Sequence, residues 1–187
     1  MRTRSFWLLV TGFGLNSVAL TSILVHGIPF ATDAGFSRAT ASFAVSMVGV
    51  GNLSSKAIWA SALQRIHPRW LATTAFSTSA VGVFCTVGAT SESILMVGFF
   101  LYGFGFGGTI PLTGSVWASY FGRAHIGAIQ GISQPASSLG SSVAPALVGL
   151  SFDRLGSYEP AFNILAGVYL LAALMIGLSR APRPKDC

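Results

Sequence analysis

The stretch from Gly49 to Trp70, GVGNLSSKAIWASALQRIHPRW, constrains the fold of this chain more than any other segment. An apolar run gives way to a short basic segment, and a second apolar run begins at Trp70. Pro68 favours an end to the first helix, because the residue before a proline disfavours helical geometry. The pattern is typical of two membrane-spanning helices joined by a tight loop, in which Arg65 and Arg69 mark one side of the bilayer.

The composition is typical of an integral membrane protein. Only 9% of the 187 residues are charged and 52% are hydrophobic, whereas soluble domains carry about 25% charged residues. The net charge of +6 is scattered over the loops, so we do not expect nucleic acid as a partner. Cys85 lies inside an apolar run and Cys187 is the last residue, and we interpret both as free thiols.

The sequence therefore predicts an all-α membrane protein with one domain of six transmembrane helices over residues 1–187. A span needs about 20 mainly apolar residues, so six spans occupy nearly the whole chain. We expect Pro29 to end the first span and Ser37 to cap the second. The predicted spans cover about 5–28, 38–63, 69–89, 93–120, 125–152 and 160–178, with a cytoplasmic tail at 179–187.

The charges alternate between the two sides of these six spans. One face is predicted to hold both termini and the cations Arg2, Arg4, Arg65, Arg69, Arg123, Arg180, Arg183 and Lys185. The other face holds two cations, Arg38 and Arg154, and four of the five acids, Asp33, Glu92, Asp153 and Glu159. By the positive-inside rule both termini are cytoplasmic, and we expect a multi-pass protein of the plasma (inner) membrane.

The loop at the end of the second span resembles the helix–basic loop–helix motif of the C-terminal half of the major facilitator superfamily. Ser55-Lys56, Ala60, Gln64-Arg65 and Arg69 occupy the motif positions. Ser55 and Ala60 replace glycines, and Gln64 replaces an aspartate whose charge is said to clamp the neighbouring helix in this family, which weakens the case for a gating role. RTRSFWLL, VHGIPFATDAGFS, YFGRAHIGAIQG and SFDRLGSYEPAF resemble further segments of the same half, closest to the monocarboxylate and oxalate/formate-exchanger-like branches.

This resemblance implies half of a twelve-helix transporter. Full members bind a small-molecule substrate between two six-helix halves near the midplane. The partner would be an N-terminal six-helix half or a second copy of the chain. The sequence leaves open whether the chain is a fragment, a split gene product or a half that pairs with itself.

Polar residues inside the spans are the candidate substrate-binding or cavity-lining groups, because such groups are costly in lipid and frequently functional. The candidates are Asn16, His26, Asn52, Lys56, Tyr102, Thr109, Gln130 and Gln134. Gln130, Gln134, Ser137 and Ser141 follow one helix face, where they could line an aqueous cavity or bond to a neighbouring helix.

Three of these candidates have two interpretations each. His26 could carry a coupled proton, or it could be a hydrogen-bonded histidine near the outer interface. Tyr102 could contact substrate or belong to the aromatic core. Lys56 lies about two turns from Arg65, with Asn52 one turn before it, and it could attract an anionic substrate or extend its stem toward water. Because no acid lies inside a span to pair with Lys56, it should face the interior or reach water.

Small residues form stripes on two predicted helices. These are Gly103, Gly107 and Gly114 on the fourth helix, and Gly127, Gly131, Ser138 and Ser142 on the fifth. They indicate close helix packing, with or without a rocking motion. The match of Gly103–Gly108 to G-x-G-x-x-G lacks the strand and the acid that a nucleotide site requires.

The sequence thus favours a secondary transporter for a small organic solute, by symport or antiport, with an organic anion as the class that Lys56 indicates. The alternative is a non-transporting membrane scaffold or an inactive transporter remnant. No catalytic set, metal-ligand spacing or cofactor motif is present, so we expect neither an enzyme nor a cofactor.

Overall fold

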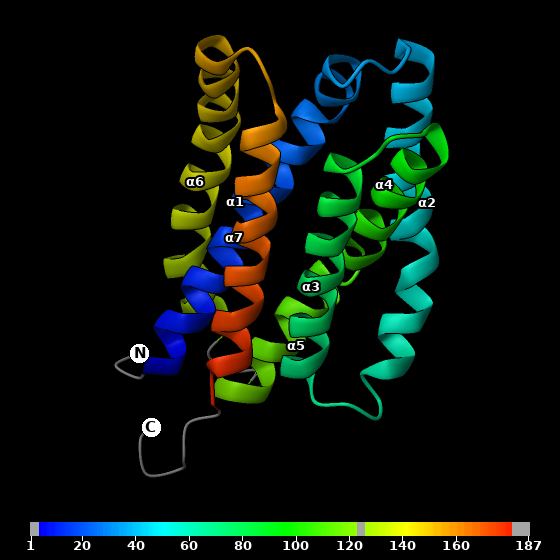
Figure 1. The fold of residues 1–187 in the computed structure, drawn as a ribbon. Helices are drawn as coiled ribbons and strands as arrows, with labels where there is room; N and C mark the ends of the chain where they lie inside the picture. Colours follow the sequence, from blue (N-terminus) through cyan, green and yellow to red (C-terminus); the bar gives the residue numbers. More distant parts are fainter. Residues whose placement is uncertain (1–3, 123–125, 181–187) are drawn as a thin grey trace.

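The computed structural model describes residues 4–122 and 126–180 of the chain (Figure 1). Within these ranges there are no strands and seven helices: α1 (Arg4–Asp33), α2 (Arg38–Ala62), α3 (Pro68–Val87), α4 (Glu92–Phe106), α5 (Thr109–Phe121), α6 (Ile126–Leu155) and α7 (Glu159–Leu178). The predicted all-α membrane fold is confirmed, and α4 and α5 together occupy the fourth predicted span. The predicted loop and tail cations Arg2, Arg123, Arg183 and Lys185 lie outside the described residues.

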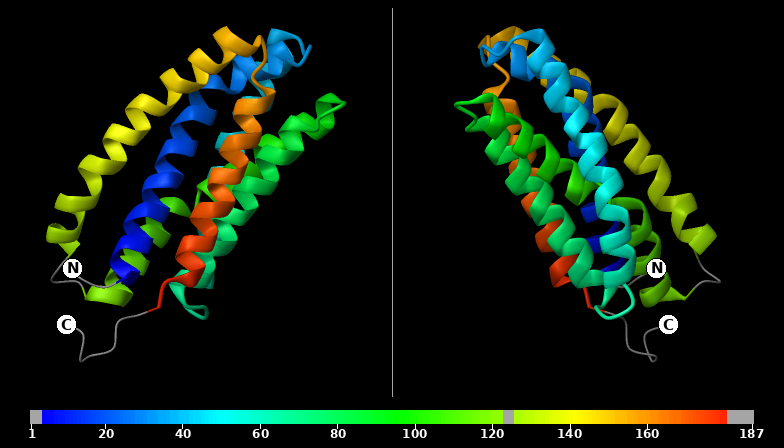
Figure 2. Two further views of the ribbon diagram at one scale, coloured as in Figure 1. Left: turned by 60° about the vertical axis from the view of Figure 1, so that its left-hand side comes forward. Right: turned by 90° about the vertical axis from the view of Figure 1, so that its right-hand side faces the viewer.

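The helices form a curved row in which each packs mainly on its neighbours. The order along the row is α6, α1, α7, α3, α4 and α2, while α5 packs on α3 and α1 also touches α2. Figures 1 and 2 show α6 along one edge of the bundle, well away from α2. Consequently α6 and α2 are the two helices with the most surface left uncovered by this chain.

Four helical segments are long and apolar enough to cross a membrane by composition alone: Arg4–Asp33, Pro68–Val87, Glu92–Phe121 and Glu159–Leu178. The other two predicted spans, α2 and α6, have 25 and 30 residues. At 1.5 Å per residue both exceed the roughly 30 Å of a hydrocarbon core. Their lower hydropathy comes from serine, glutamine, asparagine and lysine side chains, and these helices are the two ends of the row.

The first predicted helix is longer than expected. Pro29 does not end it, and α1 continues to Asp33 with Pro29 inside the helix. The chain leaves the helix through Gly35, whose φ of 90° lies in the left-handed region that favours glycine. The amide of Phe36 donates to the Ala31 carbonyl (3.1 Å) and that of Gly35 to the Thr32 carbonyl (3.1 Å), which is the Schellman pattern.

The start of α2 agrees with the predicted cap. Ser37 has extended backbone geometry, and its Oγ accepts the amide hydrogen of Thr40 at 3.1 Å. This contact satisfies one of the amide groups that a helix leaves unpaired at its first turn.

The fourth predicted span, 93–120, is two helices rather than one. The chain bends at Gly107 and Gly108, between α4 and α5. Pro111 lacks an amide hydrogen and therefore cannot donate to the Gly107 carbonyl four residues before it. In the same segment, the amide of Gly108 donates to the Gly105 carbonyl three residues before it (3.1 Å), which is a tighter turn than that of an α-helix. The bend directs α5 away from the axis of α4 and leaves Thr109 at the first position of a new helix.

Glycines let α4 lie directly against both α2 and α3. A Cβ added at Gly103 would come 2.2 Å from the Val48 carbonyl oxygen, and one at Gly105 would come 2.3 Å from the Ala75 oxygen. Gly51 on α2 and Gly82 on α3 complete these contacts from the other side. Backbone-to-backbone packing of this kind is a common way for membrane helices to associate.

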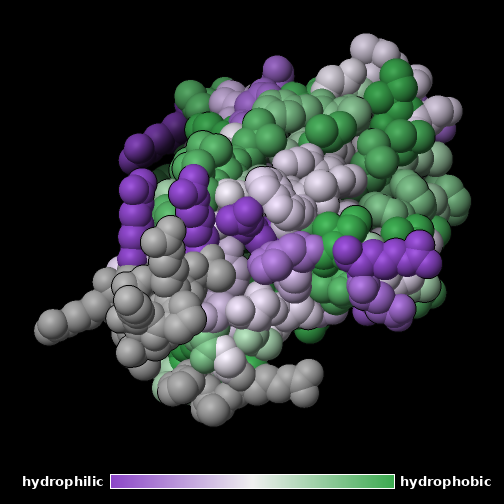
Figure 3. All heavy atoms as spheres, turned by 90° about the horizontal axis from the view of Figure 1, so that it is seen from below, coloured by the Kyte–Doolittle hydropathy of each residue, from purple (hydrophilic) through white to green (hydrophobic). Residues whose placement is uncertain are grey.

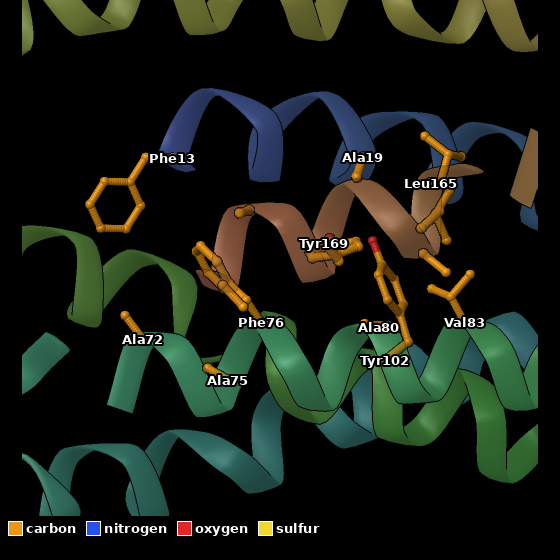
Figure 4. Close-up of a cluster of buried hydrophobic side chains, with 14 of the residues drawn as sticks. Phe13, Ala19, Ala72, Ala75, Phe76, Ala80, Val83, Tyr102, Leu165 and Tyr169 are labelled. Atoms are coloured by element: carbon orange, nitrogen blue, oxygen red, sulfur yellow. The ribbon is translucent and has the colours of Figure 1, made fainter. Parts of the chain in front are cut away.

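An aromatic core fills the middle of the row (Figure 4). Tyr102 is fully buried, meets Tyr169 edge-on with ring centroids 6.0 Å apart, and donates to the Leu20 carbonyl at 3.2 Å. Phe76 packs between the rings of Tyr169 and Phe13. These contacts hold α1, α3, α4 and α7 together.

The two ends of the described chain lie on the same face of the bundle, as six spans require. Ser5 Oγ donates to the Arg180 carbonyl at 2.6 Å. Nearby, Arg69 donates from its guanidinium to the Ser179 carbonyl, which also accepts the Tyr120 hydroxyl at 3.0 Å. Figure 3 views this face and shows hydrophilic side chains among the hydrophobic flanks of the helices. Arg69 therefore ties the start of α3 to the end of α7.

We expect Arg69→Ala to lower the free energy of unfolding by about 2 kcal/mol, because it removes a charge-assisted hydrogen bond to a helix end. The matched control is Arg65→Ala, since Arg65 is exposed in the same loop and its side chain forms no hydrogen bond with a described residue. Thermal unfolding in detergent measures both changes. Equal loss of stability in the two variants would contradict the role given to Arg69.

Candidate functional site

A polar cavity of about 90 Å³ lies between α1, α5 and α6. It is lined by Phe13, Asn16, Ser17, Thr109, Thr113, Trp117, Gln130, Ser133, Gln134 and Ser137. Four predicted candidates, Asn16, Thr109, Gln130 and Gln134, therefore meet in one place although they come from three helices. All of the polar groups in this lining are uncharged amides, hydroxyls or an indole.

Two polar atoms of the cavity are buried without a protein partner among the described residues. These atoms are Asn16 Oδ1 and Thr109 Oγ1. Asn16 is only 1% exposed. A buried polar atom left unpaired costs about 1–3 kcal/mol, so such atoms normally meet a bound water or ligand. The cavity is thus suited to hold a group that offers hydrogen-bond donors.

The bend between α4 and α5 sets the position of this site. Because α5 begins at Thr109, its first turns point Thr109, Thr113 and Trp117 toward α1. Thr113 Oγ1 donates to the Thr109 carbonyl at 2.6 Å, and the Trp117 ring packs on Phe13 with centroids 5.8 Å apart. The cavity therefore has an aromatic wall from Phe13 and Trp117 and a polar wall from α6, whose Gln130 and Gln134 are exposed.

A second pocket, of about 330 Å³, lies between α2 and the bend. It is lined by Asn52, Lys56, Ala60, Phe106, Gly107, Ile110 and Pro111. Asn52 and Lys56, predicted to share a face, do so. Lys56 is exposed and forms no ion pair with a described residue. The two pockets lie on different sides of the first turn of α5, so Lys56 does not line the polar cavity.

Residues 5–186 match the sequence profile of the family described as Major Facilitator Superfamily. The chain belongs to the major facilitator superfamily. No curated protein sequence matches it significantly. Members of this family are membrane transporters rather than enzymes, and the fold described above is consistent with one half of such a transporter.

The remaining candidates lie away from both pockets in this superfamily member. Tyr102 is in the aromatic core, and its hydroxyl bonds to the backbone of α1. Gln64 and Arg65 are exposed in the turn after α2. Arg69, the last motif position, holds the end of α7. Within the described residues no three metal-ligating side chains come together.

His26 lies in the contact between α1 and α6. Its Nε2 donates to the Pro145 carbonyl at 2.9 Å, and its ring packs against Tyr158 with centroids 5.3 Å apart. One turn earlier, Thr21 Oγ1 reaches the Ser141 carbonyl at 3.1 Å. Pro145 has no amide hydrogen, so the Ser141 carbonyl lacks its usual helical donor. Thr21 and His26 together bond α1 to α6 at the proline.

We expect Thr21→Val to lower the free energy of unfolding by about 1 kcal/mol, because the Ser141 carbonyl loses the hydrogen bond from the Thr21 hydroxyl. For the same reason, amide hydrogen exchange in α6 around Ser141 should become faster. Thr32→Val is the control, since the Thr32 hydroxyl bonds only within α1. Exchange in α6 that is the same in both variants would rule out this contact as a stabiliser of α6.

Five residues of the polar cavity were not among the candidates given above: Phe13, Ser17, Thr113, Trp117 and Ser133. Spacing could have identified Phe13, Trp117 and Ser133. Trp117 follows Thr113 by four residues, Phe13 precedes Asn16 by three, and Ser133 follows Gln130 by three, which places each pair on one helix face. The signal was weak because an aromatic residue inside a span is ordinarily a packing residue.

Proposed function

We propose that this superfamily member works as the C-terminal half of a secondary transporter. It moves a small organic solute by alternating access with a second six-helix half or a second copy of itself. The observation that supports this most is the uncovered surface of the two end helices. Gly127, Gly131, Gln130 and Gln134 on α6 are exposed, and no atom lies within 4 Å of a Cβ added at either glycine.

Such a surface is poorly matched to lipid. Amide side chains are costly in hydrocarbon, and small residues favour the close approach of another helix. By contrast, the exposed residues Leu53, Leu139 and Leu147 are suited to lipid or to a partner helix. A second half facing α2 and α6 would cover these polar groups and enclose a water-filled pathway between the halves.

The solute class follows from Lys56. An exposed cation within a membrane helix, without an acidic partner among the described residues, favours an organic anion. The transport of this anion is driven by cotransport of a proton or by exchange for a second solute. We further propose a plasma (inner) membrane location with both termini in the cytoplasm, which tags at the two ends would test by accessibility.

The test is uptake into proteoliposomes. The chain is reconstituted alone and together with a six-helix N-terminal half, and uptake of labelled lactate, oxalate and gluconate is compared with empty vesicles. Saturable uptake of at least one anion in the paired vesicles supports the proposal. Uptake equal to that of empty vesicles for every anion would favour the scaffold or inactive-remnant alternative, with which the uncharged Gln64 is compatible.

A further inference from the structure

The polar cavity between α1, α5 and α6 has the features of a ligand site of its own. It shares no lining residue with the Lys56 pocket. Asn16 is only 1% exposed, and its Oδ1 and the Thr109 Oγ1 are buried without a protein partner among the described residues. Because buried polar atoms are normally hydrogen-bonded, these two atoms indicate that the cavity holds a hydrogen-bonding molecule.

The walls from α1 and α5 offer several hydrogen-bond acceptors. The Ser17 hydroxyl donates to the Phe13 carbonyl at 3.1 Å, and the Thr113 hydroxyl donates to the Thr109 carbonyl at 2.6 Å. A hydroxyl group has one hydrogen, so the oxygen atoms of Ser17 and Thr113 can then only accept a bond from a ligand. Asn16 Oδ1 is also an acceptor. These three oxygen atoms favour a molecule that brings more than one donor.

Charged molecules of either sign are poorly suited to this cavity, because no charged side chain lines it. A carboxylate brings only acceptors and would face the oxygen atoms of Asn16, Ser17 and Thr113. An ammonium group brings donors, but it would leave water without a carboxylate to balance its charge, which is costly. A polyol has neither fault, since each of its hydroxyl groups both donates and accepts. It could also accept the hydrogen of the Thr109 hydroxyl.

The remaining walls and the volume agree with a small polyol. The rings of Phe13 and Trp117 give an apolar surface for a short carbon chain. Gln130 and Gln134 on α6 offer amide groups that both donate and accept. The volume of about 90 Å³ corresponds to roughly three water molecules at about 30 Å³ each. A molecule with about three hydroxyl groups could therefore take the place of that water.

We propose that the polar cavity is a binding site for an uncharged polyol of about the size of glycerol. The bound polyol hydrogen-bonds to α1 and α5 on one side and to α6 on the other. Since α5 and α6 have little direct contact within the described residues, the ligand would join these two helices. The proposal goes beyond the anion transport described above, because this site requires neither Lys56 nor a second six-helix half.

The experiment is an NMR titration, observed on the ligand, of the full chain in lipid nanodiscs, with empty nanodiscs as the blank. The probes are glycerol, glycerate, serinol and 1-propanol, which share a chain of three carbon atoms. Glycerate is an anion, serinol is a cation, and 1-propanol has a single hydroxyl group. We expect saturable binding of glycerol, at least about tenfold tighter than that of the other three, the equivalent of one or two hydrogen bonds.

Two substitutions in the lining test the assigned contacts. Thr109→Val keeps the shape of the side chain and removes its hydroxyl group, so it should weaken glycerol binding by about fivefold to tenfold. Asn16→Leu should weaken glycerol binding by about tenfold without weakening 1-propanol. It removes a buried polar atom that has no protein partner, so the variant should fold at least as stably as the parent chain.

The matched control is Thr78→Val. The Thr78 hydroxyl bonds only within α3, to the Thr74 carbonyl, and Thr78 does not line the polar cavity. This variant should bind glycerol as the parent chain does.

Three results would overturn the proposal. The first is that no probe binds saturably, which would mean that the cavity holds water alone. The second is that glycerate, serinol or 1-propanol binds as tightly as glycerol. The third is that Thr109→Val and Thr78→Val have the same effect. These failures are distinct from failure of the transport function: saturable anion uptake in paired vesicles without glycerol binding would leave the transporter assignment standing and reject only the polyol site.

Discussion

Replacing Gly103 by alanine is expected to lower the free energy of unfolding by about 3 kcal/mol, the largest effect on stability that we expect from one methyl group in this chain. The added Cβ would lie 2.2 Å from the Val48 carbonyl oxygen and 2.7 Å from the Val48 Cα. Both are backbone atoms, so no side-chain rotation relieves the overlap. The helices α2 and α4 must separate instead, and the contacts along their whole interface weaken.

The matched control is Gly114→Ala on α5. No atom lies within 4 Å of a Cβ at Gly114. Because alanine has the higher helix propensity, this variant should be neutral or up to about 1 kcal/mol more stable. Thermal unfolding in detergent compares the two. A Gly103→Ala variant as stable as the parent chain would mean that α2 and α4 do not pack through this glycine.

Lys56→Gln is expected to reduce kcat/KM for anion uptake in the paired vesicles by about tenfold to a hundredfold. That range corresponds to roughly 1.4–2.8 kcal/mol. It is below the approximately 4 kcal/mol of two unit charges 4 Å apart at an effective dielectric constant of 20, since Lys56 is exposed. Lys56→Arg should retain most of the activity because it keeps the charge.

Arg154→Gln is the control for Lys56. Arg154 is an exposed cation in the last turn of α6 and lines neither pocket. Initial uptake rates at several anion concentrations give kcat/KM for each variant. If Lys56→Gln and Arg154→Gln reduce uptake by the same factor, the loss reflects net charge rather than an anion site at Lys56.

The helix content and the start of α2 followed from local sequence, since Ser37 caps α2 as expected. The end of the first helix did not, because Pro29 was expected to end it and the chain instead leaves the helix at Gly35. The bend in the fourth span was missed, although Gly107, Gly108 and Pro111 stand together there. Helix propensity alone does not say whether a proline near glycines kinks a membrane helix or ends it, because neighbouring helices can satisfy the freed backbone groups.

The candidate site could be predicted only in part. Asn16, Thr109, Gln130 and Gln134 were selected as intramembrane polar residues, and they share a cavity. Lys56 was selected by the same rule and lies in another pocket. Tyr102 was also selected, yet it is buried in the aromatic core. Polar residues are rare inside membrane spans, so each of them stands out in the sequence as a candidate. The sequence does not indicate which of these residues lie next to one another in the folded chain.

The sequence by itself determined that this chain is a bundle of span-length helices with both ends on one face. Bilayer thickness and the cost of unpaired backbone groups impose run lengths and loop charges that are visible residue by residue. Only the tertiary structure decided which small-residue stripe is an internal contact. Gly103 is packed against α2, while Gly127 and Gly131 are uncovered. The reason is physical: lipid and protein interior are equally apolar, so hydrophobicity does not distinguish the inward face of a membrane helix from the outward one.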